Sequence, residues 1–412
     1  MLRYGILMLM MTGLSVVVAD LKADSIPPGS AIFGPGECPP IVVGRTTYNN
    51  GICDDRIHYT AMKKRLVIDT DGVSDDVRAV SLALQHPQAE VLALTCVNGC
   101  VSVEQAVANM ARTIRANDRT NIPIYKGAEF PLIGNGHVPL DESHLFGSDG
   151  IGNAPEDFPK VHEDDFKAHV PNKHAAVALV EIFEKNQGTT LVCIGPLTNI
   201  ALALKLNPCF AKLPEKMVIM GGNIHGAGNV RSQSTAEYNF SNDPEAAHIV
   251  LKEMKCPITL CPWETFLFTS SRKDIDFHAH LKLDVPLAKF FTTATKLGVV
   301  EMVKNDRQFS YCDEIAVSVA LEPEKVIQEY KVMRASVELH GEYTRGQVAY
   351  DWMETLWANS KDHPRLCQKR QPITIVTAID CKHLDNMIFD SIHNSSKGVG
   401  LEKNLEQVVG TT

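Results

Sequence analysis

Residues 69–76 read Asp-Thr-Asp-Gly-Val-Ser-Asp-Asp, which places four carboxylates within eight residues. The segment follows an apolar run, residues 66–68, and precedes a helix-like pattern. Carboxylates this close raise one another's pKa, so at a strand end they indicate a bound cation, a shared proton or full solvation. A solvated turn at a helix N-terminus, where the helix dipole favours Asp, is the alternative.

The segments around these carboxylates alternate between strand-like and helix-like patterns. The patterns predict strands at 65–69, 90–96, 190–194 and 216–220, and helices at 74–85, 103–116, 173–185, 198–205, 244–255 and 313–321. We therefore predict an α/β fold, a three-layer Rossmann-like domain with a mostly parallel central sheet. Ligands bind at the carboxyl ends of such strands, so the polar residues that follow each strand should converge on one crevice.

Six short motifs stand out along the chain. They are Asp69-Thr-Asp-Gly-Val-Ser-Asp-Asp76, Gly195-Pro-Leu-Thr-Asn-Ile-Ala201, Met220-Gly-Gly222, Ala236-Glu-Tyr-Asn239, Asp243-Pro-Glu-Ala-Ala247 and Thr344-Arg-Gly-Gln347. In this order they resemble those of the calcium-dependent nucleoside hydrolases, from near Lys64 to near Asp351, and most of all the inosine-uridine preferring, secreted eukaryotic type. The resemblance implies the nucleoside hydrolase fold and hydrolysis of the N-glycosidic bond of ribonucleosides to free base and ribose.

The resemblance also implies a Ca²⁺ site. Asp71, Asp76, Asp313 and the main-chain carbonyl of Thr198 would hold one calcium ion, with water and sugar hydroxyls in the remaining positions. Calcium takes six to eight hard oxygen ligands, which carboxylates and carbonyls supply. Asp71 would be the catalytic residue, a general base that accepts a proton from a calcium-bound water.

Substrate contacts are implied in the same way. Asp75 would accept hydrogen bonds from ribose hydroxyls, and Glu237 and Asn239 would bind the remaining hydroxyls. Ordinary loop polarity is the alternative for the last two. The complete set of expected substrate-binding residues is Asp75, Asn229, Glu237, Asn239, Met220, Asn98 and Asp313.

Three positions depart from the pattern of the family. Cys312 precedes Asp313 where the best-known members have His, and a neutral thiol is a poor acid for a purine ring. Cys100 replaces an Asn, for which Asn98 is the candidate substitute, and Phe146 stands where many members have His.

What replaces the histidine acid stays open. His144 and His225 flank the predicted crevice, and Phe146, Trp263 and Tyr311 could stack on a base. A surface histidine and ordinary aromatic packing are the alternatives. Stacking without a histidine acid favours purine substrates over pyrimidine ones.

The ends of the chain differ in character from its middle. Residues 1–19, with Arg3 and an apolar run before Ala19, fit a secretory signal, and the run is shorter than the ~20 residues of a spanning helix. We expect an irregular extension at 20–62, one catalytic domain at 63–385 and a tail at 386–412. The mature protein should be extracellular, with no membrane contact.

Composition limits the partners. The chain has 49 Asp and Glu against 40 Lys and Arg and no basic cluster, which argues against nucleic acid. Small-molecule nucleosides are the expected partners, and the family suggests a homodimer or homotetramer. Eleven cysteines leave at least one unpaired, and Cys38 with Cys53 and Cys367 with Cys381 are the suggested pairs.

Two rival functions fit part of the sequence. Asp69-x-Asp also matches the nucleophile segment of haloacid-dehalogenase-like phosphatases, but those need a later Gly-Asp dipeptide, which this chain lacks. A non-catalytic, secreted nucleoside- or ribose-binding protein of the same fold is the second rival. Asp71 beside the metal argues against it, because binding alone needs no base.

Overall fold

The structure is a computed structural model that describes residues 63–133, 142–167, 169–230, 235–354 and 370–409. The expected signal peptide at 1–19 and the extension at 20–62 lie outside the described residues, as do Cys38, Cys53 and Cys367. Within the described part, no helix combines the length and the apolar character needed to cross a membrane.

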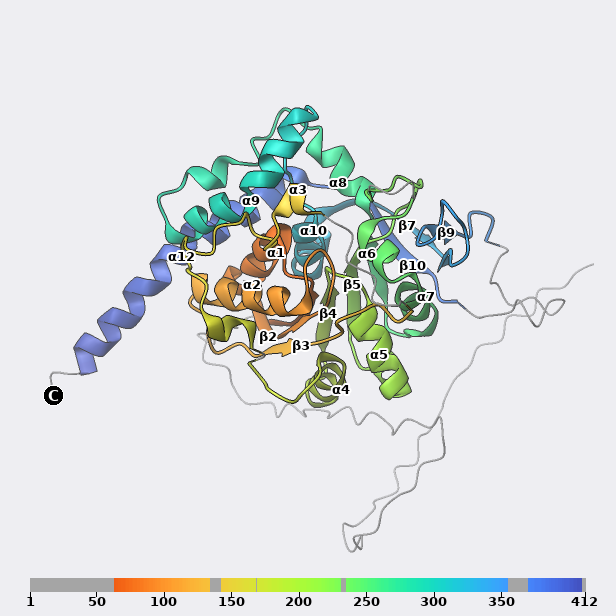
Figure 1. The fold of residues 1–412 in the computed structure, drawn as a ribbon, viewed down its shortest axis with the longest axis horizontal. Coiled ribbons are helices and arrows are strands. Elements are labelled where there is room, and N and C mark those ends of the chain that lie inside the picture. Colours follow the sequence, from red (N-terminus) through yellow and green to blue (C-terminus); the bar gives the residue numbers. More distant parts are fainter. Residues whose placement is uncertain (1–62, 134–141, 168, 231–234, 355–369, 410–412) are drawn as a thin grey trace, which may run out of the picture. The chain divides into compact units, whose positions relative to one another are not determined.

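An eight-stranded sheet forms the centre of the domain, in the order β3-β2-β1-β4-β5-β6-β10-β7 (Figure 1). All neighbouring strands in it pair in parallel except β10 and β7, which are antiparallel. The predicted fold class is confirmed. The strands are β1 Lys64–Thr70, β2 Ala89–Cys96, β3 Ile124–Lys126, β4 Thr189–Cys193, β5 Lys216–Met220, β6 Ile258–Cys261, β7 Ile327–Met333 and β10 Ile373–Ile379, with β8 Ala335–Val337 and β9 Val348–Tyr350 in a separate antiparallel pair.

Helices cover both faces of the sheet and bury two apolar cores, one on each face. One core packs α1, α2, α9, α10 and α12, and the other packs α4, α5 and α7. The helices are α1 Ser74–Gln85, α2 Val103–Ala116, α3 Ser143–Phe146, α4 Ala175–Lys185, α5 Thr198–Leu206, α6 Tyr238–Asn242, α7 Pro244–Glu253, α8 Trp263–Ser270, α9 Pro286–Lys304, α10 Asp313–Leu321, α11 Pro323–Val326 and α12 Cys381–Val409.

Most predicted elements agree with the observed ones to within two residues. Helix α4 begins at Ala175 rather than at 173, because the ring of His174 caps it by accepting a hydrogen bond from the Ala176 N–H at 3.1 Å. Ser, Thr, Asp and Asn are the residues that usually mark the start of a helix in a sequence. Because His is not one of them, the start of α4 could not be predicted from its cap.

The C-terminal end differs from the expectation. The predicted border between domain and tail at 385 falls inside α12, and Ile388 and Ile392 beyond it are buried in the core. The suggested pairing of Cys367 with Cys381 is wrong, because Cys381 is a free, buried thiol.

The turn between β1 and α1 brings the acidic segment to the carboxyl end of the sheet. Gly72 adopts φ +74° there, and a Cβ on it would lie 2.7 Å from the Ala106 Cα of α2. A residue with a side chain would therefore be strained and would push the helix away. The close packing of this turn on α2 fixes where the Asp side chains point.

Candidate active site

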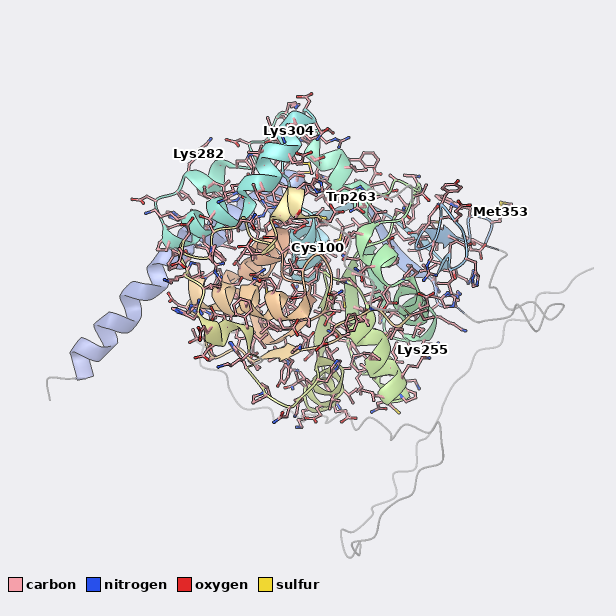
Figure 2. The ribbon with its side chains drawn as sticks, in the orientation of Figure 1. Cys100, Lys255, Trp263, Lys282, Lys304 and Met353 are labelled. Carbon is pink, nitrogen blue, oxygen red and sulfur yellow. The ribbon has the colours of Figure 1, made fainter. Side chains whose placement is uncertain are left out.

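A cavity of about 500 Å³ opens at the carboxyl ends of the central strands. Figure 2 labels Cys100 and Trp263, two of its lining residues, in the middle of the molecule. Residues far apart in the sequence meet in its wall, as the strand-end argument predicted. Eight of the expected site residues lie there: Asp71, Asp75, Asp76, Met220, Asn229, Glu237, Asn239 and Asp313.

Hydrogen bonds from the turn and from the loop after β2 hold two of the carboxylates. Asp71 Oδ2 accepts from the Cys100 N–H at 2.8 Å. Asp76 accepts from the Val73 N–H at 3.0 Å and from the hydroxyl of Thr70, whose oxygen in turn accepts from the Gly72 N–H. Both side chains are therefore positioned by backbone that belongs to the acidic segment and to the loop after β2.

Asp69 lies beneath the cavity rather than in its wall. Its Oδ1 accepts hydrogen bonds from Thr95 Oγ1 at 2.5 Å and from Asn199 Nδ2 at 2.9 Å. Burial raises its pKa to about 7. Asp69 joins β1, β2 and α5 below the site, which is a structural role and gives no support to an attacking nucleophile at this position.

Burial makes the carboxylate group costly to ionise. It raises the pKa of Asp71 to about 6, and it raises the pKa of Asp75 above its usual range. The pKa of Asp76 and that of Asp313 are raised further, by burial and by the neighbouring carboxylates. Such a cluster needs protons or a cation to compensate it.

The donor atoms suit a hard cation. Asp75, Cys312 and Asp313 each bring one ligand atom within 4.8 Å of the others. Burial and the nearby carboxylates raise the pKa of the Cys312 thiol well above its usual value, so in the absence of a metal it is neutral and a weak ligand. The remaining donors are carboxylate oxygens, which fit Ca²⁺ better than a soft metal.

Thr198 is the predicted metal ligand that the cavity wall does not include. It is the first residue of α5 and is buried, and its hydroxyl donates to Asp243 Oδ2 at 2.7 Å. The hydrogen bond orients the first turn of α5 below the carboxylates. Its main-chain carbonyl as a ligand stays a prediction.

Glu237 caps helix α6 from within the cavity wall. Its Oε1 accepts from the Asn239 N–H at 2.8 Å, and its Oε2 accepts from the N–H groups of Gly222 at 2.7 Å and Phe240 at 3.1 Å. Burial raises its pKa to about 7 although these bonds oppose the shift. The carboxylate is fixed in place by three backbone donors and faces the cavity beside Asn239.

Asn229 reaches the cavity from the loop after β5. Its side-chain Oδ1 is buried without a hydrogen-bond partner among the described residues, which leaves it free to accept from a substrate. Glu264 of α8 holds this loop, because its carboxylate accepts from the N–H groups of Ile224 at 2.9 Å, His225 at 2.8 Å and Ala227 at 3.2 Å.

Asn98 is the expected substrate-binding residue that the structure does not bring into the cavity wall. Asn98 is buried and is not one of the lining residues, and its N–H donates to the Ala128 carbonyl at 2.9 Å. Cys100, two residues later, lines the cavity instead. A contact of Asn98 with substrate therefore stays a prediction.

The candidates for leaving-group assistance separate into two groups. His144, Phe146 and Trp263 line the cavity, and Trp263 stacks on Phe266 with ring centroids 4.4 Å apart. His225 lines a different cavity. Tyr311 is buried outside the wall, and its hydroxyl donates to Asp385 Oδ1 at 2.6 Å.

Some lining residues were not predicted. They come from segments outside the six motifs: Glu142, Glu301, Met302, Asn305 and Phe309. Helix α9 supplies part of this set, and its pattern could have been recognised from Pro286 at its first position. Nothing in the sequence indicated that its C-terminal end reaches the site.

Residues 66–386 match the family model described as inosine-uridine preferring nucleoside hydrolase. This chain belongs to that family. The resemblance based on the six motifs is confirmed at the level of the family.

Relatives within this nucleoside hydrolase family include enzymes named for different bases. Uridine nucleosidase 1 of Arabidopsis thaliana is 34% identical over 208 residues, and an inosine-uridine preferring nucleoside hydrolase of Leishmania major is 31% identical over 194 residues. The match covers 50% and 47% of this chain and 58% of each relative, so the chain spans less than two thirds of their length.

Two solved structures show the same fold. An inosine-guanosine nucleoside hydrolase superposes with a TM-score of 0.69 at 30% identity and covers 81% of this chain and 99% of its own. A purine-preferring ribonucleoside hydrolase from Gardnerella vaginalis gives a TM-score of 0.68 at 25% identity and covers 81% and 99%.

Proposed function

We propose that this protein hydrolyses the N-glycosidic bond of ribonucleosides, releasing free base and ribose, with calcium in its active site. The observation that carries the proposal is the lining of the cavity, which combines two kinds of side chain. The carboxylates of Asp71, Asp75, Asp313 and Glu237 line it together with aromatic rings that include Trp263. A nucleoside has two matching parts, a polar sugar and a flat base.

The carboxylates are suited to the sugar half of the reaction. Bound calcium, held by Asp71, Asp76, Asp313 and the Thr198 carbonyl, would lower the pKa of a water molecule and orient the ribose hydroxyls. Asp71, fixed by the Cys100 N–H, is positioned to accept the proton of the attacking water. The anionic wall favours the positive charge that develops on the sugar in the transition state.

The aromatic lining of the cavity supports a preference for purines. Relatives are named for uridine, for inosine and guanosine, and for purines in general, so the family alone does not choose. Trp263, stacked on Phe266, offers an aromatic face that a purine covers better than a pyrimidine does. His144 is the histidine in the wall that could donate a proton to the leaving base.

Product release from purified protein tests the proposal. Base and ribose would be measured from inosine, adenosine, guanosine, uridine and cytidine, with calcium and after chelation. Calcium-dependent release, faster from the purines, is the expected result. Calcium-dependent nucleoside binding without release would favour the binding-protein alternative. Release from uridine and cytidine alone would contradict the purine preference.

We also propose that the protein is exported after cleavage behind Ala19. The signal-like pattern of residues 1–19 supports this. N-terminal sequencing of protein recovered from the medium of expressing cells should begin at Asp20. Protein that is retained in the cells with Met1 intact would contradict it.

A further inference from the structure

We propose that strand β7 is a surface through which two copies of this chain associate, by extending the central sheet across a twofold axis. The proposal is independent of the catalytic activity. It begins from the position of β7 (Figure 1), which ends the eight-stranded sheet and pairs only with β10 among the described strands. The outer edge of such a strand carries backbone N–H and C=O groups that another strand can satisfy.

The surface of β7 differs from that of the other strands of the central sheet. Five consecutive residues, 328–332, are exposed, whereas each of the other strands has at most one exposed residue. Tyr330 is 61% exposed and Val332 51% exposed, and they share a face because side chains alternate along a strand. Phe268 of α8, 59% exposed, lines a cavity that residues 328–331 also line. The edge is therefore exposed and partly apolar.

The two charged residues Glu329 and Lys331 alternate with Tyr330, and their arrangement is complementary to that of a second copy of the strand. Strand β7 runs from Ile327 to Met333, so its midpoint is Tyr330. In a twofold antiparallel pairing of the whole strand, Tyr330 meets its own copy, and Glu329 of each copy lies opposite Lys331 of the other. Full overlap of the strand thus places two pairs of opposite charges across the axis, and opposite charges stabilise cross-strand pairs.

The same residues are available for this contact. Glu329 has no ion-pair partner in the part of the chain that the structure describes. Lys331 lies with its Nζ 5.9 Å from the centre of the Trp352 ring, on an exposed side chain that can turn to a partner. Charged residues on an edge strand can also prevent two such strands from pairing. Two lysines at positions 329 and 331 would repel a second copy, whereas a Glu and a Lys placed symmetrically about the midpoint attract it.

Charge reversal tests the pairing and its register. Glu329→Lys alone places lysine opposite Lys331 twice, and Lys331→Glu alone places glutamate opposite Glu329 twice. Each variant should halve the particle mass measured by sedimentation and weaken self-association by about tenfold to a hundredfold. An equimolar mixture of the two variants should recover the wild-type mass, because every pair across the axis is then of opposite sign.

Controls separate this result from a general effect of charge. Lys255→Glu makes the same change at an exposed site away from β7 and should leave the mass unaltered. Thermal melts should show that all variants are folded, since these side chains lie on the surface. Unchanged mass in both single reversals, or a mixture that does not recover the mass, would overturn the proposal.

Discussion

The side chain of Asp71 is tightly packed against the loop after β2. A Cβ added to Gly99 would lie 2.1 Å from Asp71 Oδ2, the oxygen that accepts the Cys100 N–H. The loop after β2 therefore both binds and confines the carboxylate that we propose as the base. The role of Asp71 can therefore be tested by changes that keep the size of its side chain or that only displace it.

Asp71→Asn keeps the shape of the side chain and removes its capacity to accept a proton. We expect kcat to fall by about 10²–10⁴-fold, the usual contribution of general base catalysis, and calcium binding to weaken. Steady-state release of base and a calcium titration would measure the two effects. Turnover close to that of the wild type would rule out Asp71 as the base.

Gly99→Ala substitutes none of the predicted site residues and should still impair the enzyme. The added methyl group overlaps Asp71 Oδ2, so the carboxylate or the loop must move. A shift of about 1 Å can cost on the order of 10²-fold in rate. Turnover measured beside the thermal melt would distinguish a displaced carboxylate from an unfolded protein, and an unaltered kcat would show that the loop yields freely.

The sequence could predict the site residues that stand at the ends of recognisable elements better than the others. Asp71 and Met220 stand at the ends of β1 and β5, Asp313 begins α10, and all three line the cavity. Asn98 also follows a strand, but it is not among the lining residues. The direction of a side chain on a loop depends on backbone angles that residue type does not determine.

At the scale of elements, α1 and α10 are joined through a buried ion pair. Arg78 Nε lies 2.6 Å from Glu314 Oε1, and the two side chains are 1% and 0% exposed. Arg78 also donates to the Ser310 carbonyl at 2.8 Å, and Glu314 accepts from the Cys312 N–H at 2.9 Å. The pair thus fixes the segment that leads into Asp313 against the helix that carries the other carboxylates.

Removing one member of this pair should be costly. Arg78→Met leaves the Glu314 charge buried without its partner, and we expect a loss of about 3–5 kcal/mol of stability. The double variant Arg78→Met with Glu314→Gln should recover much of this loss, because the charge is then removed while an acceptor for Cys312 N–H stays. Denaturant unfolding of the three proteins would decide, and equal stability of the two variants would contradict a charge effect.

The elements themselves were largely predictable up to α7 and much less so after it. Helix α1 and strand β5 coincide with their predicted bounds because apolar periodicity and the Gly or Asp at their ends are clear. Strand β6 lies between α7 and α8, and strand β10 lies between β9 and α12; neither is among the predicted strands. Residues of α12 beyond 385 were predicted to belong to a tail, because their apolar positions are separated by polar ones.

At the scale of the whole molecule, the buried carboxylates make stability depend on calcium and pH. Burial raises the pKa of Asp69 to about 7 and that of Asp71 to about 6, from 3.8 in an ordinary setting. The calcium-free folded state thus binds more protons than the unfolded state between about pH 4 and pH 7. Its stability must fall as the pH rises through this range.

The corresponding measurement is a series of thermal melts from pH 5 to pH 8. After chelation the melting temperature should decrease as the pH rises, and added calcium should raise it by about 5 °C at neutral pH, because calcium binds the folded site. A melt that ignores calcium at every pH would count against a metal among these carboxylates.

The order of strands at the end of the sheet also determines when the sheet can be completed during synthesis. Strand β10, residues Ile373–Ile379, lies between β6 and β7 although it is made after both. A growing chain therefore contains β7 some forty residues before the strand that attaches it to the sheet. Until β10 has been synthesised, β7 lacks the strand with which it pairs in the sheet. The domain can therefore be completed only after its last strand has been made.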